Sequence, residues 1–138
     1  LAEAGPREIA IADTIGVAVP NQIKEVIGAI KNEVPDIKLR CHLHNSRNTG
    51  FANAIAAIEA GVEALDASIG GIGGCPFAPN ATGNISTDDL VYMLDRSGIE
   101  TGVDLEKIIE TTLWLETVLG KPVPSQVAKS GIFPPRKE

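Results

Sequence analysis

The sequence predicts an α/β fold in which strands and helices alternate around a parallel sheet. Three short apolar runs have the composition of buried strands, at 8–13, 37–44 and 64–69. They do not alternate strictly between apolar and polar residues, which is typical of parallel strands covered on both faces. Helical patterns separate the runs, and this order of elements indicates repeated βα units.

Two helices are predicted between these strands. The first follows Pro20, a residue suited to a first helical turn, and carries apolar residues at helical spacing until Pro35. The second is marked by apolar residues from Phe51 to Ile58, and Gly61 is placed to cap its C-terminus. Each predicted helix therefore connects one strand to the next, as in a parallel sheet.

The last third of the sequence predicts two more helices. Ser86 has the pattern of an N-cap for a helix that runs through Leu94. A further helix is expected from about Asp104 to Gly120, with an apolar side formed by Leu105, Ile108, Ile109, Leu113 and Leu115. The proline-rich tail from Lys121 is expected to be extended and partly mobile.

Composition limits the classes of function. The chain has 138 residues, 43% of them hydrophobic, and a net charge of -6, which fits one compact domain over 1–138 and argues against nucleic acid as the main partner. No apolar run is long enough for a bilayer, and no signal-peptide pattern is seen. The two cysteines form no disulfide framework, so a cytoplasmic protein is expected. The chain opens at Leu1 in what looks like the tail of a helix, which suggests a piece of a longer protein.

His42 and His44 are the most informative residues. Side chains two apart on a strand point to the same face, so this pair at the end of an apolar strand presents two imidazoles to one spot. Imidazole is a common metal ligand, and the pair therefore predicts a divalent-cation site. The alternative is two partly exposed histidines with no shared partner.

Other candidate residues lie at the same predicted edge. The carboxyl ends of parallel strands carry the active site in such folds, which would bring Asp13 and the glycine-rich loop 70–84 beside the histidines. The loop fits neither a Walker A motif nor a dinucleotide fingerprint. Cys75 in that loop could donate or accept a proton, and Asn84 could offer an oxygen to a hard cation. The alternatives remain a turn residue for Asp13, an inert thiol for Cys75 and a helix-entry residue for Asn84.

Several motifs in this order resemble the hydroxymethylglutaryl-CoA lyase family. They are Ala12-Asp13-Thr14-Ile15-Gly16, the run from His42 to Arg47, the run Gly73-Gly74-Cys75-Pro76-Phe77-Ala78 that leads to Gly83-Asn84, and Thr87 to Leu94 followed by Thr101-Gly102-Val103. The resemblance covers nearly the whole chain, and the combination is far more specific than any single motif. Asn45 and Arg47 depart from the animal enzymes, which bears on the substrate rather than on the reaction.

The resemblance implies a (β/α)8 TIM barrel, of which this chain would be the C-terminal portion, about strands six to eight plus trailing helices. It implies that His42, His44 and Asn84 bind Mg²⁺ or Mn²⁺, that Cys75 is the catalytic thiol, and that Asp13 acts near the substrate hydroxyl. A fourth ligand and an arginine of the family site lie outside this sequence. The implied reaction is a metal-assisted retro-Claisen cleavage of hydroxymethylglutaryl-CoA, or of a close analogue such as a longer branched acyl-CoA, to acetyl-CoA and acetoacetate.

Two alternatives stay open. Claisen-condensing synthases of the isopropylmalate and homocitrate type share the histidine pair, but their loop reads Gly-Glu-Arg where Gly74-Cys75-Pro76 stands here. The chain alone could also be an inactive metal-binding piece, since the first half of the barrel is missing. The expected partners are a small acyl-CoA substrate and a second copy of the enzyme in a homodimer, with no nucleic acid and no membrane.

Overall fold

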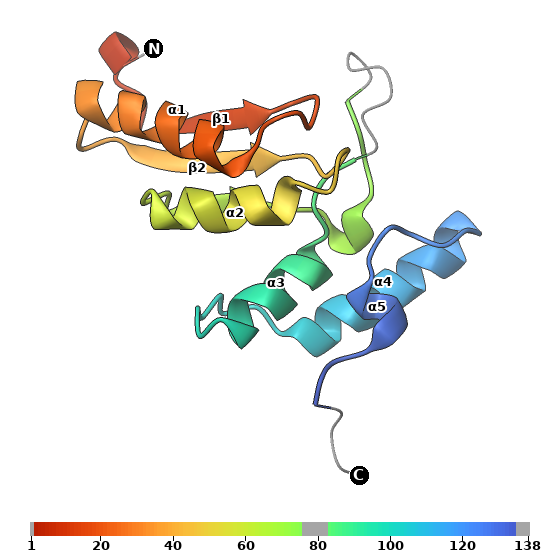
Figure 1. Ribbon diagram of the computed structural model, residues 1–138. Coiled ribbons are helices and arrows are strands. Elements are labelled where there is room, and N and C mark those ends of the chain that lie inside the picture. The colour runs from red at the N-terminus through yellow and green to blue at the C-terminus, as the bar shows by residue number, and fades with distance from the viewer. Residues whose placement is uncertain (1, 76–82, 135–138) are drawn as a thin grey trace. The chain divides into compact units, whose positions relative to one another are not determined.

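The computed structural model in Figure 1 describes residues 2–75 and 83–134. Residues 76–82 of the predicted glycine-rich loop and residues 135–138 of the tail lie outside the described residues. The chain forms two compact units, one made of Leu1–Asp66 with Gly74–Asn84 and the other of Ala67–Gly73 with Ile85–Glu138. Each unit is described by itself below. No helix in the part of the chain that the structure describes is long and apolar enough to cross a membrane.

The first unit is built on a parallel sheet with the strand order β1-β2-β3. Its strands are β1 (Glu8–Asp13), β2 (Lys38–Leu43) and β3 (Ala64–Asp66), and a short 3-10 helix η1 (Ala2–Ala4) precedes them. The first two strands confirm the prediction to within a residue. The third ends at Asp66, three residues earlier than predicted, and the 3-10 helix η2 (Ile69–Gly71) follows it, with a kink at Gly70 where φ is 67°.

Helices α1 (Pro20–Glu33) and α2 (Gly50–Glu59) lie side by side in this unit, and α2 packs on β2 (Figure 1). Both confirm the helical patterns in the sequence. Along β2 the odd-numbered side chains are buried, while Arg40 and His42 between them are only partly buried. The core of the unit therefore lies on one face of β2, formed by Ile23, Ile27, Leu39, Cys41, Leu43, Ala54, Ala56, Ala57 and Val62. The other face of β2 carries the polar side chains.

The second unit is helical, with α3 (Thr87–Arg96), α4 (Leu105–Leu119) and α5 (Val127–Ser130). The predicted N-cap at Ser86 is confirmed, since its hydroxyl accepts the backbone N–H of Asp89 at 3.3 Å. Asp104 is the N-cap of α4, and its carboxylate accepts the backbone N–H of Glu106 at 3.1 Å. Gly120 ends α4 in the left-handed conformation at φ 65°.

Two expectations for the second unit were wrong. The tail is not extended throughout, because the Asp89 carboxylate accepts the backbone N–H groups of Gln126 and Val127 at 3.0 and 2.7 Å and so starts α5. The predicted apolar side of α4 is not buried as a stripe: Leu113 is 46% exposed, and Thr112 is the buried residue of this helix.

Thr112 is buried because it serves a polar core around Asp88, which the sequence analysis did not identify. The Asp88 carboxylate accepts the hydroxyls of Thr112 at 2.5 Å and Ser86 at 3.1 Å, and the backbone N–H of Gly70 at 2.8 Å. A buried carboxylate is tolerated only when such donors satisfy it. Asp88 thereby joins η2, α3 and α4.

Candidate active site

Three of the predicted site residues, His42, His44 and Asn84, lie together at the end of β2. Strand β1 ends at Asp13, and β2 ends one residue before His44. His44 forms an antiparallel bridge with Asn84, and the backbone N–H of Asn45 donates to the Gly83 carbonyl at 3.0 Å. The structure therefore brings Asn84 beside the histidine pair, although 40 residues of sequence separate it from His44.

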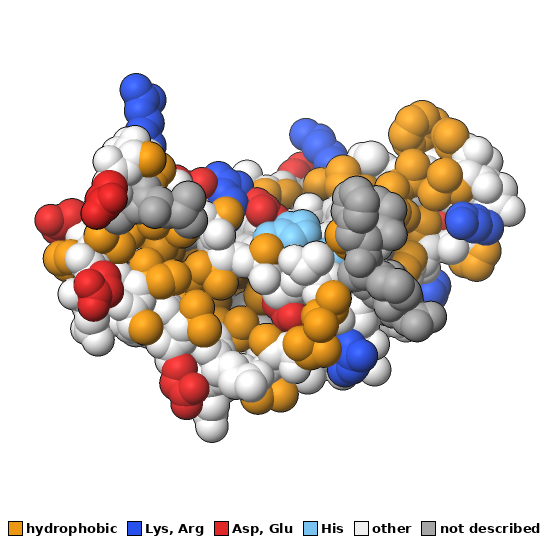
Figure 2. Space-filling model, turned by 90° about the horizontal axis from the view of Figure 1, so that it is seen from above, with side chains coloured by type: hydrophobic (Ala, Val, Ile, Leu, Met, Phe, Trp, Pro, Cys, Tyr) orange, Lys and Arg blue, Asp and Glu red, His pale blue; other side chains and the backbone are white. Residues whose placement is uncertain are grey.

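The two imidazoles point their Nε2 atoms at each other. The Nε2 atoms of His42 and His44 are 3.2 Å apart, and the rings meet edge to face with centroids 5.1 Å apart. His44 is buried at 3% exposure, whereas the His42 side chain is 37% exposed. The face in Figure 2 accordingly shows imidazole atoms at the surface, drawn in pale blue. This confirms the prediction that the side chains of His42 and His44 point to the same face.

This geometry fits a shared cation. Two nitrogens that bind one metal ion at about 2.1 Å in neighbouring octahedral positions lie about 3 Å apart. Two bare nitrogen lone pairs at such a separation repel each other unless a proton or a cation lies between them. The Nδ1 atom of His44 is buried without a hydrogen-bond partner among the described residues, and it can carry the ring proton when Nε2 binds a metal ion.

The described residues do not complete a site of three acidic, cysteine or histidine ligands. No group of three such side chains that could hold a metal ion occurs in 2–75 and 83–134. His42 and His44 supply two nitrogens, and Asn84 adds an amide, which is a neutral ligand. The ligand set within this chain therefore fits part of a divalent-cation site.

A charged network lies beside His42, and the sequence analysis did not assign it. Arg40 donates from Nε to Glu8 Oε1 and from Nη1 to Asp66 Oδ1, each at 2.7 Å. These hydrogen bonds raise the pKa of Arg40 further above its ordinary value, the one with Glu8 most. The other oxygen of Asp66 lies 3.6 Å from His42 Nδ1. The period of two along β2 places Arg40 and His42 on one face and was the signal available in the sequence.

Asp13 anchors the loop that follows β1. Its two carboxylate oxygens accept the backbone N–H groups of Val17 and Ala18 at 3.0 and 3.1 Å. The strand register pairs Asp13 with Leu43, whereas the neighbouring Ala12 pairs with His42. Asp13 therefore leaves the sheet on the face opposite His42. The structure gives Asp13 a positioning role in the loop, and the catalytic role predicted for it stays a prediction.

The loop after β1 is held by three further contacts. Arg47 donates to the carbonyls of Ile15 and Gly16 at 2.9 and 3.0 Å. The buried Asn53 of α2 donates to the Ala18 carbonyl at 2.8 Å. Gly16 has φ 60°, and a Cβ there would lie 2.8 Å from the Ser46 hydroxyl, so only glycine fits. Hydrogen bonds from Arg47 and Asn53 thus hold the loop after β1 in place at this edge of the sheet.

The two cysteines lie in different environments. Cys41 faces the core from β2 and is fully buried, and this burial, helped by the charge of Asp66, raises its pKa to about 11. Cys75 is half-buried, in irregular structure after Gly73 and Gly74. Cys41 is therefore a residue of the core, while the catalytic role predicted for Cys75 stays a prediction.

Iodoacetamide at pH 8 is expected to alkylate Cys75 and to spare Cys41 in the folded protein. A thiol with a pKa of about 11 is ionised in about one molecule in a thousand at that pH, and Cys41 is also shielded. Peptide mass spectrometry measures both sites, and alkylation in guanidinium chloride, which should modify both, is the control. Equal rates at the two cysteines in the folded state would contradict the assignment.

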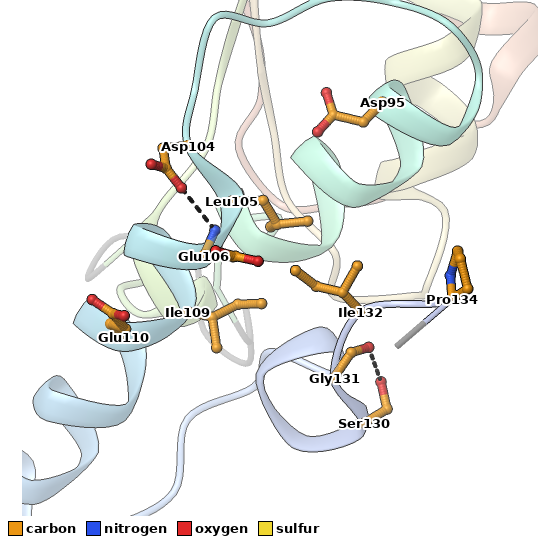
Figure 3. Close-up of a pocket in the computed structure, with 10 residues that line it drawn as sticks. All are labelled: Asp95, Asp104, Leu105, Glu106, Ile109, Glu110, Ser130, Gly131, Ile132 and Pro134. Atoms are coloured by element: carbon orange, nitrogen blue, oxygen red, sulfur yellow. Dashed lines mark hydrogen bonds between the residues drawn. The ribbon is translucent and has the colours of Figure 1, made fainter. Parts of the chain in front are cut away.

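A separate cavity lies within the second unit, between α3, α4 and the segment after α5 (Figure 3). Its volume is about 750 Å³. Leu105, Ile109 and Ile132 form an apolar part, and carboxylates of Asp95, Asp104, Glu106 and Glu110 surround it. Because these carboxylates repel anions, this cavity suits an anionic ligand such as a CoA thioester poorly. The histidine edge of the first unit is the stronger candidate for the active site.

Comparison with known proteins gives the family of the chain. The family model described as HMGL-like matches residues 1–114. The chain belongs to the HMGL-like family. It is 48% identical over 131 residues to (R)-citramalyl-CoA lyase of Chloroflexus aurantiacus and 43% identical over 133 residues to the hydroxymethylglutaryl-CoA lyase YngG of Bacillus subtilis. Each alignment covers 94% of this chain, but only 41% and 44% of the respective relative.

Solved structures of HMGL-like proteins also match. An HMG-CoA lyase from Acinetobacter baumannii, solved with coenzyme A and 3-methylmalate, superposes with a TM-score of 0.92 at 41% identity. The match covers 99% of this chain and 45% of that one. The prediction that the three parallel strands belong to part of a TIM barrel of the HMG-CoA lyase type is thus confirmed. The chain spans less than half the length of these relatives.

Proposed function

We propose that the protein carrying this chain is a metal-dependent lyase that cleaves a branched 3-hydroxyacyl-CoA into acetyl-CoA and a keto acid. The observation that carries the proposal is the 3.2 Å approach of the His42 and His44 Nε2 atoms beside Asn84, at the carboxyl edge of the sheet. Membership of the HMGL-like family and relatives named as acyl-CoA lyases support it. The Claisen-condensing synthases predicted as an alternative are less well supported by these relatives.

His42, His44 and Asn84 would hold Mg²⁺ or Mn²⁺ with ligands from outside the chain. When bound there, such a cation supplies Lewis-acid polarisation of the substrate oxygens. The hydrogen bonds of Asp13, Arg47 and Asn53 hold the neighbouring loop in place, which limits the positions that a bound substrate can take.

The proposed reaction needs one base and one acid. A base takes the proton of the tertiary hydroxyl, the bond between the carbinol carbon and the CH₂ of the thioester breaks, and a ketone forms. The electron pair of that bond passes to the thioester as an enolate, which a proton donor converts to acetyl-CoA. The base is not assigned to Asp13, because its carboxylate lies on the face opposite His42 and accepts two backbone N–H groups. Cys75 is the proposed donor, since a thiol is acidic enough to protonate an enolate.

The two named activities among the relatives give two candidate substrates. Hydroxymethylglutaryl-CoA and citramalyl-CoA share the methyl-substituted carbinol and the thioester, and they differ by one methylene before the free carboxylate. The 48% identity to (R)-citramalyl-CoA lyase favours the shorter acid, while the 41% identity to the HMG-CoA lyase structure supports the longer one. A pocket that differs by one methylene discriminates by about 10- to 200-fold.

The test is a product assay on the full-length protein with each substrate, with and without a chelator. Both substrates should release acetyl-CoA, but the second product is acetoacetate from hydroxymethylglutaryl-CoA and pyruvate from citramalyl-CoA. We expect kcat/KM for one substrate to exceed the other by at least about tenfold, and activity to disappear with chelator and return with Mg²⁺ or Mn²⁺. No acetyl-CoA from either substrate, or full activity in the chelator, would refute the proposal.

A further inference from the structure

A line of charged side chains crosses the three strands of the first unit and ends at His42. Glu8 of β1 binds Arg40 of β2, Arg40 binds Asp66 of β3, and the carboxylate of Asp66 reaches towards the ring of His42. The separations are 2.7 Å, 2.7 Å and 3.6 Å. Because the backbone register pairs His42 with Asp66, the last approach is built into the sheet.

The two carboxylate oxygens of Asp66 have different partners. Oδ1 accepts the Nη1 hydrogen of Arg40, so the carboxylate has one fixed orientation. In that orientation Oδ2 faces Nδ1 of His42, and the Nε2 atom of the same ring faces His44. The guanidinium of Arg40 is itself held by both oxygens of Glu8, at 2.7 and 3.4 Å. The network therefore orients the Asp66 carboxylate so that Oδ2, and not Oδ1, lies next to the imidazole of His42.

The contact between Asp66 and His42 acts through charge and orientation. At 3.6 Å it is longer than a hydrogen bond. A carboxylate at this place still favours the neutral tautomer with the proton on Nδ1, because that proton lies nearest the negative charge. The Nε2 lone pair is then free for a cation. A metal-binding histidine is commonly fixed in this way by a group beside its second nitrogen.

We propose that Asp66, held by Arg40, is the positioning residue that selects the metal-binding tautomer and ring orientation of His42. The proposal rests on the proposed function, since it concerns the same histidine. The competing explanation is a purely structural one, in which the ion pairs only join the strands. The side chains of this network are 33–39% exposed, and ion pairs that open to solvent contribute little to the stability of a fold.

The experiment measures Mn²⁺ binding to the full-length protein by titration calorimetry or electron paramagnetic resonance, with Mn²⁺ alone as the probe. Asp66→Asn should raise the Kd at least about tenfold, because the amide keeps the shape but loses the charge. Asp66→Glu, which restores a carboxylate, should recover part of the affinity. Glu59→Gln is the matched control, since Glu59 forms a 2.6 Å ion pair with Lys24 in the same unit, and it should leave the Kd unchanged.

The tautomer of His42 can also be measured directly by spectroscopy, and the decisive measurement is made on the wild-type protein. Nitrogen-15 spectra of histidine-labelled, metal-free protein at alkaline pH should place the proton of His42 on Nδ1, with the signal assigned by its loss in His42→Gln. Asp66→Asn should shift that ring towards a mixture of tautomers. A wild-type His42 with its proton on Nε2 would overturn the proposal, whether or not the Asp66 variants fold.

The outcomes separate this proposal from the proposed function. If His42→Ala binds Mn²⁺ as the wild type does, the metal site itself is wrong. If His42→Ala loses affinity while Asp66→Asn binds like Glu59→Gln and keeps the wild-type tautomer, the metal site stands and Asp66 has only a structural role. A loss of affinity in Asp66→Asn, with partial rescue in Asp66→Glu, supports the assignment.

Discussion

Replacing either His42 or His44 with alanine is expected to remove Mn²⁺ binding and to lower turnover by about 10²- to 10³-fold or more. The two Nε2 atoms lie 3.2 Å apart, so both can bind the same cation. Each alanine variant loses one of these two nitrogen ligands. Loss of one preorganised group that stabilises developing negative charge has effects of this size. Affinity and turnover should therefore fall together in both variants.

The two substitutions differ in how much they can disturb the fold, and both need a control variant on the same strand. His44 is buried, so His44→Ala also leaves a cavity, and its far-UV circular dichroism must match the wild type. His42 is partly exposed, which makes His42→Ala the cleaner test. Lys38 is exposed at the opposite end of β2, and Lys38→Ala should leave binding and turnover unchanged. Normal Mn²⁺ affinity in both histidine variants would remove the site assignment.

The parts of the fold that local sequence patterns determine were predictable. Apolar runs and capping residues located β1, α1 and the start of α3 to within a residue, because burial and hydrogen-bonded caps act over a few neighbouring positions. The histidine pair was predictable for the same reason, since a period of two along one strand fixes the face of both imidazoles.

The rest depended on register and on contacts between distant residues. Asp13 was expected near the histidines because it ends β1, but the pairing of Asp13 with Leu43 places it on the other face, where its carboxylate binds the loop. The pairing of His42 with Asp66 likewise cannot be read from spacing, because it requires the register of two strands. The short helix α5 depends on Asp89, 37 residues before Gln126.

Replacing Cys75 with serine is expected to lower kcat by about 10²- to 10⁴-fold and to leave Mn²⁺ affinity unchanged. A thiol has an ordinary pKa of about 8.5, whereas a serine hydroxyl is a much weaker acid, so the variant keeps the shape but loses the proton donor that the enolate requires. Because Cys75 is not among the predicted metal ligands, the cation site should be intact. Steady-state kinetics and Mn²⁺ titration on the full-length protein measure the two effects separately.

The second cysteine supplies the matched control for this prediction. Cys41 lies on β2 next to His42, but its side chain faces the buried core, and its pKa of about 11 leaves it protonated and shielded from substrate. Cys41→Ala should therefore change stability rather than kcat. If Cys75→Ser retained wild-type turnover, the thiol would not be the donor. If Cys75→Ser lost Mn²⁺ binding as well, its effect would pass through the metal site, and protonation of the enolate would need another group.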